Sequence, residues 1–214
     1  MLLPCFYNAP VSYFGLILQA DSLQIEVYDH YSKQTYRNRC KIFGANGIIN
    51  LSIPVKKVNG NNTYVKDIEI DYTNPWNLVH WKSICSAYRS SPFFELMEDS
   101  FAPFYQKRFK YLTDLNLGLM ETTLDHLQWS RELIQTKQFD YKPVIPDCRE
   151  IIHPKRQFTS DRYNFTPQEY YQVFKEKHGF KKDLSILDLL FNEGPNAGGI
   201  LKRSIDHSNP AEQK

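Results

Sequence analysis

The chain opens with two short apolar runs separated by a segment of helical periodicity. Residues 2–7 (LLPCFY) and 23–29 (LQIEVYD) have the length and composition of strands, whereas apolar positions within 10–21 recur at helix spacing. A strand, a short crossover helix and a second strand predict a parallel pair. The apolar face of the helix consists of Tyr13, Phe14, Ile17 and Leu18.

Alternation of apolar and polar residues continues through the next part of the chain. Residues 40–55 predict two strands that meet at Asn46-Gly47, a dipeptide favoured in tight hairpin turns. Residues 64–71 (YVKDIEID) alternate in the same way and predict another strand. We therefore expect residues 1–72 to be mainly sheet.

From Pro75 onwards the pattern becomes helical, with a less regular, proline-containing stretch at 141–158. The predicted helices cover 75–91, 92–112 with a bend or break at Pro103, 113–135 and 166–180, and a last helix starts at 185 and is stopped by Gly194-Pro195. Together the two halves predict an α+β fold, in which an N-terminal mixed sheet packs against a helical half at 75–200. We expect one domain over 1–200 and a mobile tail at 201–214.

Composition and charge narrow the classes of function. The 26 basic and 24 acidic residues give a net charge of +2, without the basic excess of a protein that binds duplex DNA. The four cysteines lack the close spacing of zinc or redox motifs. The N-terminus lacks the features of a signal peptide, and no apolar run is long enough to span a bilayer. We expect a cytoplasmic protein with no nucleic-acid partner, no membrane insertion, no metal and no cofactor.

Residues 26–40 (EVYDHYSKQTYRNRC) form the densest polar cluster, and the common phosphate-loop and hydrolase motifs are absent. Arg37 and Arg39 lie two apart, so on an extended chain they point to the same side. Two guanidinium groups on one side predict a receptor for phosphate or carboxylate. The alternative is a salt-bridged strand that helps to hold the sheet together.

Two further residues could take part in catalysis. His80 lies on a predicted helix face that also carries Tyr88, where it could be a buried core histidine or a general base. Asp29 lies at the end of a predicted strand, a position that often faces a ligand crevice in open α/β sheets. Nothing in the spacing of Asp29, His30 and His80 supports a metal site.

Several of these segments resemble the WbqC-like protein family, in the form found in Bacteroides-type bacteria. The resemblance covers about residues 3–200 and rests on DHYSKQTYRNRC (29–40), HWKSICSAYRSSPFFE (80–95), SILDLLFNEG (185–194) and the hairpin with LSIPV after it. Many members have an acidic pair followed by V-Q where this chain reads YDHY (28–31), and Asp29 is the acid retained here. The resemblance implies glycyl, aminoacyl or other acyl transfer to an amino sugar in surface-polysaccharide biosynthesis.

The leading hypothesis is a transferase for an anionic small molecule, either a nucleotide-linked sugar or an activated acyl group. In it His80 is the base and Asp29 supports the histidine or an arginine. The expected substrate-binding residues are Lys33, Tyr36, Arg37, Asn38, Arg39 and Tyr88. The alternative is a non-catalytic module that binds a nucleotide, a sugar or a protein, with no base near the anion. RNA binding is a third possibility, which the near-neutral charge disfavours. The oligomeric state stays open.

Overall fold

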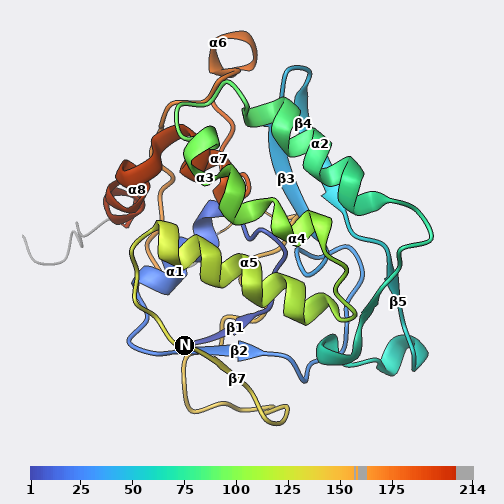
Figure 1. The fold of residues 1–214 in the computed structure, drawn as a ribbon. Coiled ribbons are helices and arrows are strands. Elements are labelled where there is room, and N and C mark those ends of the chain that lie inside the picture. Colours follow the sequence, from blue (N-terminus) through green and yellow to red (C-terminus); the bar gives the residue numbers. More distant parts are fainter. Residues whose placement is uncertain (157, 159–162, 206–214) are drawn as a thin grey trace, which may run out of the picture.

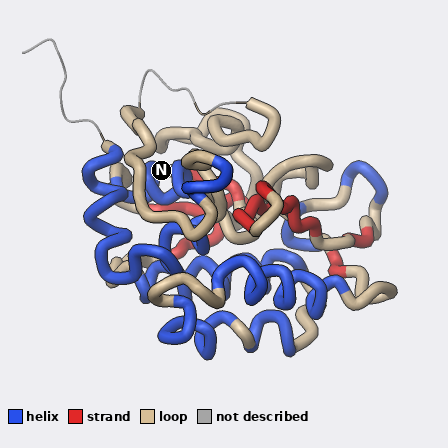
Figure 2. The backbone as a smooth tube through the Cα atoms, turned by 90° about the horizontal axis from the view of Figure 1, so that it is seen from above, coloured by secondary structure: helices blue, strands red, loops and turns tan. Residues whose placement is uncertain are grey.

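The computed structural model describes residues 1–156, 158 and 163–205, and it confirms the α+β class (Figure 1). A small parallel sheet and two antiparallel strand pairs are combined with helices from both halves of the chain. Most helices lie in a layer on one side of the strands, whereas long loops cover the other side (Figure 2). In this part of the chain, no helix combines the length and the apolar character needed to cross a bilayer.

The parallel sheet has the order β1-β2-β7. Strand β1 (Leu2–Pro4) pairs with β2 (Leu23–Glu26), and helix α1 (Val11–Leu18) forms the crossover between them. The predicted parallel pair and its helix are therefore confirmed. On the other side of β1, a parallel bridge joins Leu2 to Asp147.

The third strand, β7 (Leu133–Gln135), was not expected from the sequence. The helix predicted over 113–135 is α5 (Leu112–His126), and the prediction is wrong beyond its end. Gln128 has a φ of 57°, a left-handed conformation that ends the helix. The chain then continues to β7, where pairing with β2 outweighs the helical periodicity of Leu133 with the preceding leucines.

The antiparallel pairs form separate small sheets. Strands β3 (Arg39–Gly44) and β4 (Gly47–Ser52) make the predicted hairpin, and Gly47 has the positive φ (108°) that its turn requires. Strand β5 (Val55–Lys56) pairs with β6 (Glu69–Ile70). Only the end of the predicted strand 64–71 is thus a strand, because Val65–Asp67 turns as a 3₁₀ helix.

The helical layer begins after the sheets, and the helix predicted over 92–112 is broken at Pro103, which is the first residue of a separate short helix. Its helices are α2 (Trp76–Tyr88), α3 (Phe94–Phe101), α4 (Pro103–Gln106) and α5. Helix α7 (Ile186–Glu193) packs into the core, where Phe191 contacts Tyr88, Phe94 and Phe101. These aromatic contacts join the C-terminal segment to the helical layer.

Two predictions for the C-terminal part need correction. The helix expected over 166–180 is reduced to α6 (Lys175–His178), and Gly179, with a positive φ, directly follows it. The preceding segment is held by tertiary contacts instead, since the Thr166 amide donates to the Ser204 carbonyl. Helix α8 (Ala197–Ser204) extends into the expected tail, and residues 206–214 lie outside the described residues.

Candidate functional site

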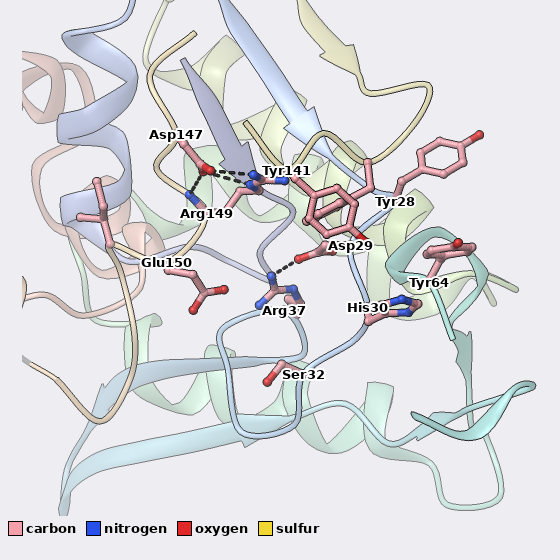
Figure 3. A pocket seen from close by; sticks show the side chains of 12 residues that line it. Tyr28, Asp29, His30, Ser32, Arg37, Tyr64, Tyr141, Asp147, Arg149 and Glu150 are labelled. Carbon is pink, nitrogen blue, oxygen red and sulfur yellow. Dashed lines mark hydrogen bonds and ion pairs between the residues drawn. The ribbon is translucent and has the colours of Figure 1, made fainter. Parts of the chain in front are cut away.

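A cavity of about 670 Å³, here called cavity 1, lies at the carboxyl edge of the parallel sheet (Figure 3). Its walls come from chain segments that follow β2, β7 and the Leu2–Asp147 bridge. Ligands often bind at this edge of α/β sheets because loops after neighbouring parallel strands meet there. The lining includes Tyr28, Asp29, His30, Arg37, Tyr64, Phe139, Tyr141, Asp147, Arg149 and Glu150.

Asp29 and Arg37 form a buried ion pair on the floor of cavity 1. One terminal nitrogen of Arg37 donates to Asp29 Oδ2, while Asp29 Oδ1 and Arg37 Nε have no hydrogen-bond partner among the described residues. Burial raises the pKa of Asp29, although the Arg37 guanidinium acts in the opposite direction. The pair therefore contains one buried acceptor and one buried donor without a partner among the described residues.

Arg37 is held in place through its backbone. The Asn116 side-chain amide on α5 donates to the Arg37 carbonyl at 2.8 Å, and the neighbouring Tyr36 carbonyl accepts from the Tyr7 amide at 2.9 Å. The loop that carries Arg37 is thus fixed to the chain after β1 and to the helical layer.

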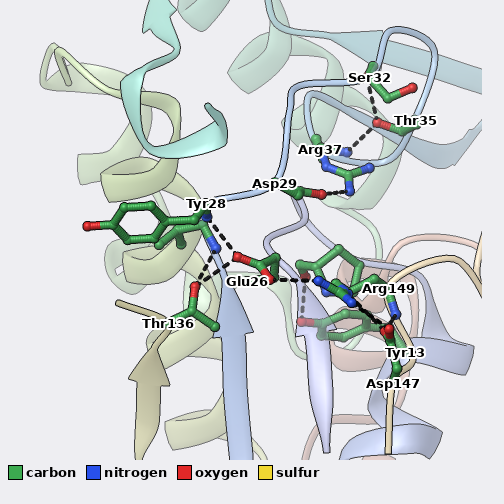
Figure 4. A network of polar contacts seen from close by, with 12 residues as sticks. Tyr13, Glu26, Tyr28, Asp29, Ser32, Thr35, Arg37, Thr136, Asp147 and Arg149 are labelled. Atoms are coloured by element: carbon green, nitrogen blue, oxygen red, sulfur yellow. Dashed lines mark hydrogen bonds and ion pairs between the residues drawn. The ribbon is translucent and has the colours of Figure 1, made fainter. Parts of the chain in front are cut away.

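A second arginine links the sheet to the opposite wall (Figure 4). Arg149 donates to Glu26 at 3.0 Å and contacts both carboxylate oxygens of Asp147, at 2.9 and 2.6 Å. Its guanidinium also lies 4.5 Å from the centre of the Phe139 ring. The hydrogen bond from Arg149 is the main cause that holds the pKa of Asp147 below its ordinary value.

Aromatic rings surround the mouth of cavity 1. His30 stacks on Tyr64, with ring centres 4.9 Å apart and an angle of 13° between the planes. On another side, Phe139 and Tyr141 meet edge to face at 4.9 Å. The mouth thus offers flat apolar faces beside hydrogen-bonding groups, which suits a ligand with both apolar and polar faces.

The charges of the lining nearly cancel. Two arginines face three carboxylates, those of Asp29, Asp147 and Glu150, and each arginine is already ion-paired with a carboxylate. Figure 3 shows the Glu150 side chain pointing toward Arg37. Cavity 1 therefore lacks the uncompensated positive charge that an anion receptor requires.

The expected substrate-binding residues separate into different environments. Arg37 lies in a turn, whereas Arg39 is the first residue of β3, so the two side chains do not share one side of an extended strand as predicted. Arg39 does not line cavity 1. Lys33 is exposed in the same turn. Asn38 is buried and donates to the Ile53 carbonyl at 2.8 Å, whereas Tyr36 lines a separate cavity.

His80 and Tyr88 lie in the core, and neither lines cavity 1. His80 Nδ1 is 2.9 Å from the Tyr7 hydroxyl, and its ring packs against Trp76. Burial lowers the pKa of His80 to about 4. The Tyr88 hydroxyl accepts from the Phe43 amide at 3.2 Å, which ties α2 to β3. Of the two residues assigned to catalysis from the sequence, Asp29 alone faces cavity 1.

Sequence reasoning missed the Arg149 side of the cavity. Glu26 was seen only as part of a dense segment, and its partner Arg149 is 123 residues away in an irregular stretch. No periodic pattern marks Asp147, Arg149 or Glu150. The parallel bridge at Leu2 and the ion pair between Arg149 and Glu26 bring them to the sheet. Across the described ranges, no group of three or more His, Cys, Asp or Glu side chains could hold a metal ion.

Comparisons with known proteins find similarity over most of the chain. The sequence model of the WbqC-like protein family matches residues 6–163, which include Asp29, Arg37 and Arg149. An uncharacterized protein of Mycobacterium tuberculosis is 25% identical over 214 residues, covering 89% of this chain and 91% of the relative. No solved structure matches the chain significantly.

Proposed function

The chain belongs to the WbqC-like protein family, and within that family we propose that it is an acyl or aminoacyl transferase whose cavity 1 binds an amine-bearing sugar. The setting that we propose is surface-polysaccharide biosynthesis. The acceptor amine would lie beside Asp29, and the sugar ring would lie against the aromatic mouth.

The observation that carries this proposal is the state of the Asp29 carboxylate. Arg37 fixes one oxygen, and the other is buried next to cavity 1 without a partner among the described residues. A buried acceptor without a partner is unfavourable, so a bound N–H group would be strongly stabilised there. The raised pKa of Asp29 makes it a stronger base than an ordinary carboxylate.

The charge and shape of cavity 1 support an amine-bearing sugar over an anion. The excess carboxylate in the lining favours a cationic or hydrogen-bond-donating ligand. Tyr64 and Tyr141 offer ring faces for the apolar side of a sugar, and a cation can also be attracted by such faces. A volume of about 670 Å³ is within the range of small-molecule pockets.

In the proposed step, the lone pair of the acceptor nitrogen forms a bond to the carbonyl carbon of the activated acyl group. The bond from that carbon to the leaving group breaks, and its electron pair departs with the leaving group. The surplus proton on nitrogen passes to Asp29. Arg37 acts as a positioning residue, because it holds the carboxylate in one orientation.

The test compares methyl glycosides of glucosamine and galactosamine with their N-acetylated forms by isothermal titration calorimetry. We expect the free amines to bind the natural protein at least ten times more tightly, and Asp29→Asn to abolish this preference. Asp99→Asn, which neutralises an exposed carboxylate on α3, is the matched control and should behave like the natural protein. Equal binding of both sugar forms to the natural protein would contradict the acceptor assignment.

A second candidate is a sugar-binding module without catalysis, favoured by the enclosure of His80 in the core. Mass spectrometry after incubation with amino sugars and acyl thioesters or aminoacyl adenylates separates the two functions. A mass gain that Asp29→Asn eliminates supports transfer, whereas binding without any acylated product across these donors supports the module.

A further inference from the structure

A second cavity of about 610 Å³, here called cavity 2, has a charge pattern that differs from that of cavity 1. Among the described residues, its lining contains one carboxylate, Asp183. The basic side chains of the lining are Lys41, Lys155, Arg156 and Lys182. Four positive charges face one negative charge, whereas the charges of cavity 1 nearly cancel.

Among the described residues, no carboxylate lies within ion-pair distance of the cations of cavity 2. Lys41 donates to the Pro154 carbonyl at 3.2 Å, and Lys155 donates to the Gln34 side-chain oxygen. The contact of Arg156 is with a backbone carbonyl. Within the described ranges, none of the four basic side chains forms an ion pair. Over the described part of the chain, cavity 2 therefore carries an excess of positive charge that is not held in ion pairs.

The single acid of cavity 2 is committed to the fold. One oxygen of Asp183 accepts from the Ser12 amide in the first turn of α1 at 2.8 Å. Burial raises the pKa of Asp183, although the Ser12 hydrogen bond and the charge of Lys41 act in the opposite direction. The one negative charge of Asp183 does not balance the positive charges of the four basic side chains.

Aromatic side chains complete the lining of cavity 2. Tyr36 is buried, with the Lys41 amine 5.9 Å from its ring centre, and the rings of Phe158 and Phe165 meet edge to face at 5.9 Å. Cations beside flat apolar surfaces are a suitable environment for a phosphate group joined to an aromatic base.

The two cavities share a wall. Tyr36 lines cavity 2, and the next residue, Arg37, lines cavity 1. Likewise Glu150 lines cavity 1, while its backbone carbonyl accepts from Arg156 of cavity 2 at 3.5 Å. A ligand in cavity 2 would therefore lie one wall away from Asp29.

We propose that cavity 2 binds the diphosphate of a nucleoside diphosphate group on a substrate, with Lys41, Lys155, Arg156 and Lys182 as its cationic receptor. This inference rests on the proposed transferase function and adds to it the site of an anionic substrate portion. Cavity 1 then binds the amine and cavity 2 binds the phosphates.

The test uses calorimetric titration of UDP, ADP, GDP, CDP and inorganic pyrophosphate, with the unphosphorylated nucleosides as references. The variant Arg156→Gln/Lys182→Gln removes two charges from cavity 2. Lys82→Gln/Lys107→Gln removes two exposed charges that line neither cavity. Arg156→Lys/Lys182→Arg keeps the charge in place. Thermal unfolding of each variant establishes that it is folded.

We expect at least one nucleoside diphosphate to bind the natural protein more tightly than its nucleoside, with an affinity that falls as salt rises. The Arg156→Gln/Lys182→Gln variant should bind it at least ten times more weakly, and the other two variants should retain binding. Absence of binding to the natural protein, or unchanged binding to a folded Arg156→Gln/Lys182→Gln variant, would overturn the proposal. Amino-sugar binding to the same variants reports on cavity 1 separately, so the failure of one site is not mistaken for failure of the other.

Discussion

Two buried residues give the fold opposite dependences on pH. Burial lowers the pKa of His80 from 6.5 to about 4, so the unfolded chain takes up a proton that the folded chain does not. The stability that neutral His80 contributes is therefore lost as the pH falls from 6.5 to about 4. Asp188 accepts from Tyr170 at 2.7 Å, and burial raises its pKa from 3.8 to about 6. Its contribution is present at low pH and lost as the pH rises through 6.

The His80→Gln variant isolates the histidine, because Asp188 is present in both proteins and its contribution cancels. Relative to the variant, we expect the natural protein to lose about 3 kcal/mol of unfolding free energy between pH 7 and 4. Urea unfolding at several pH values measures this difference. If the unfolding free energies of the two proteins differed by the same amount at every pH, His80 would be protonated as easily in the folded state as in the unfolded chain.

The Asp29–Arg37 pair makes a second prediction for single residues. Arg37→Ala leaves a buried carboxylate without its partner, and we expect a loss of about 3 kcal/mol in chemical unfolding. Arg39→Ala is the matched control, since Arg39 has no ion pair among the described residues and should cost clearly less. If Asp29→Ala/Arg37→Ala were as unstable as the sum of both single variants, the two side chains would be energetically independent.

For single residues, the sequence predicted the Asp29 and Arg37 side of cavity 1. Asp29 and Arg37 lie close enough along the chain for their chemistry to be noticed together. The partition of Tyr36 and Arg37 into different cavities could not be predicted, because it depends on a turn rather than on a strand. The enclosure of His80 by Tyr7 depends on a contact across 73 residues.

Among the larger elements, two glycines separate the effect of backbone conformation from that of packing. Gly179 and Gly194 both have positive φ, at 71° and 51°, and follow α6 and α7. A Cβ on Gly179 would meet nothing within 4 Å, whereas one on Gly194 would lie 2.4 Å from the ring of Phe93. The same substitution therefore adds backbone strain at both positions and a steric clash only at Gly194.

We expect Gly179→Ala to cost about 1–3 kcal/mol from backbone strain alone. Gly194→Ala should cost about 1–3 kcal/mol more, because the half-buried ring of Phe93 must shift. Thermal and urea unfolding of both variants measure the difference. Equal losses would mean that Phe93 moves aside without cost.

Local patterns determined which elements were predictable. The β1-α1-β2 unit and the Asn46-Gly47 hairpin are set by residues close in sequence, and both were predicted. Strand β7 was not, because its partner β2 is more than a hundred residues earlier. Residues 166–174 have a helical pattern but are held by contacts such as that between Thr166 and Ser204.

Across the whole molecule, Arg149 joins segments that are distant in sequence. Its guanidinium contacts Glu26 at the end of β2 and Asp147 in the wall of cavity 1. It also donates to the backbone carbonyl of Asp140. Loss of these contacts should loosen the wall without disturbing the helical layer.

We expect Arg149→Ala to raise amide hydrogen exchange over residues 137–151 by roughly tenfold or more, with little change in α2 and α5. Arg149→Lys keeps the charge but loses the planar fork, so it should behave almost as Arg149→Ala does. Exchange measured by mass spectrometry on peptides from both regions is the readout. A uniform rise in every peptide would indicate global destabilisation instead.

The order of the parallel sheet also bears on how the chain is made. Strands β1 and β2 emerge first during synthesis, but their neighbours are β7 on one side and Asp147 on the other. Until residue 147 has left the ribosome, this nascent sheet has open edges. Strand β7 and residue 147 can pair with it only late in synthesis, and pairing between parallel strands far apart in sequence is slow. A stalled chain that ends near α5 would expose strand edges prone to aggregation, so this protein depends on completing translation before its sheet can close.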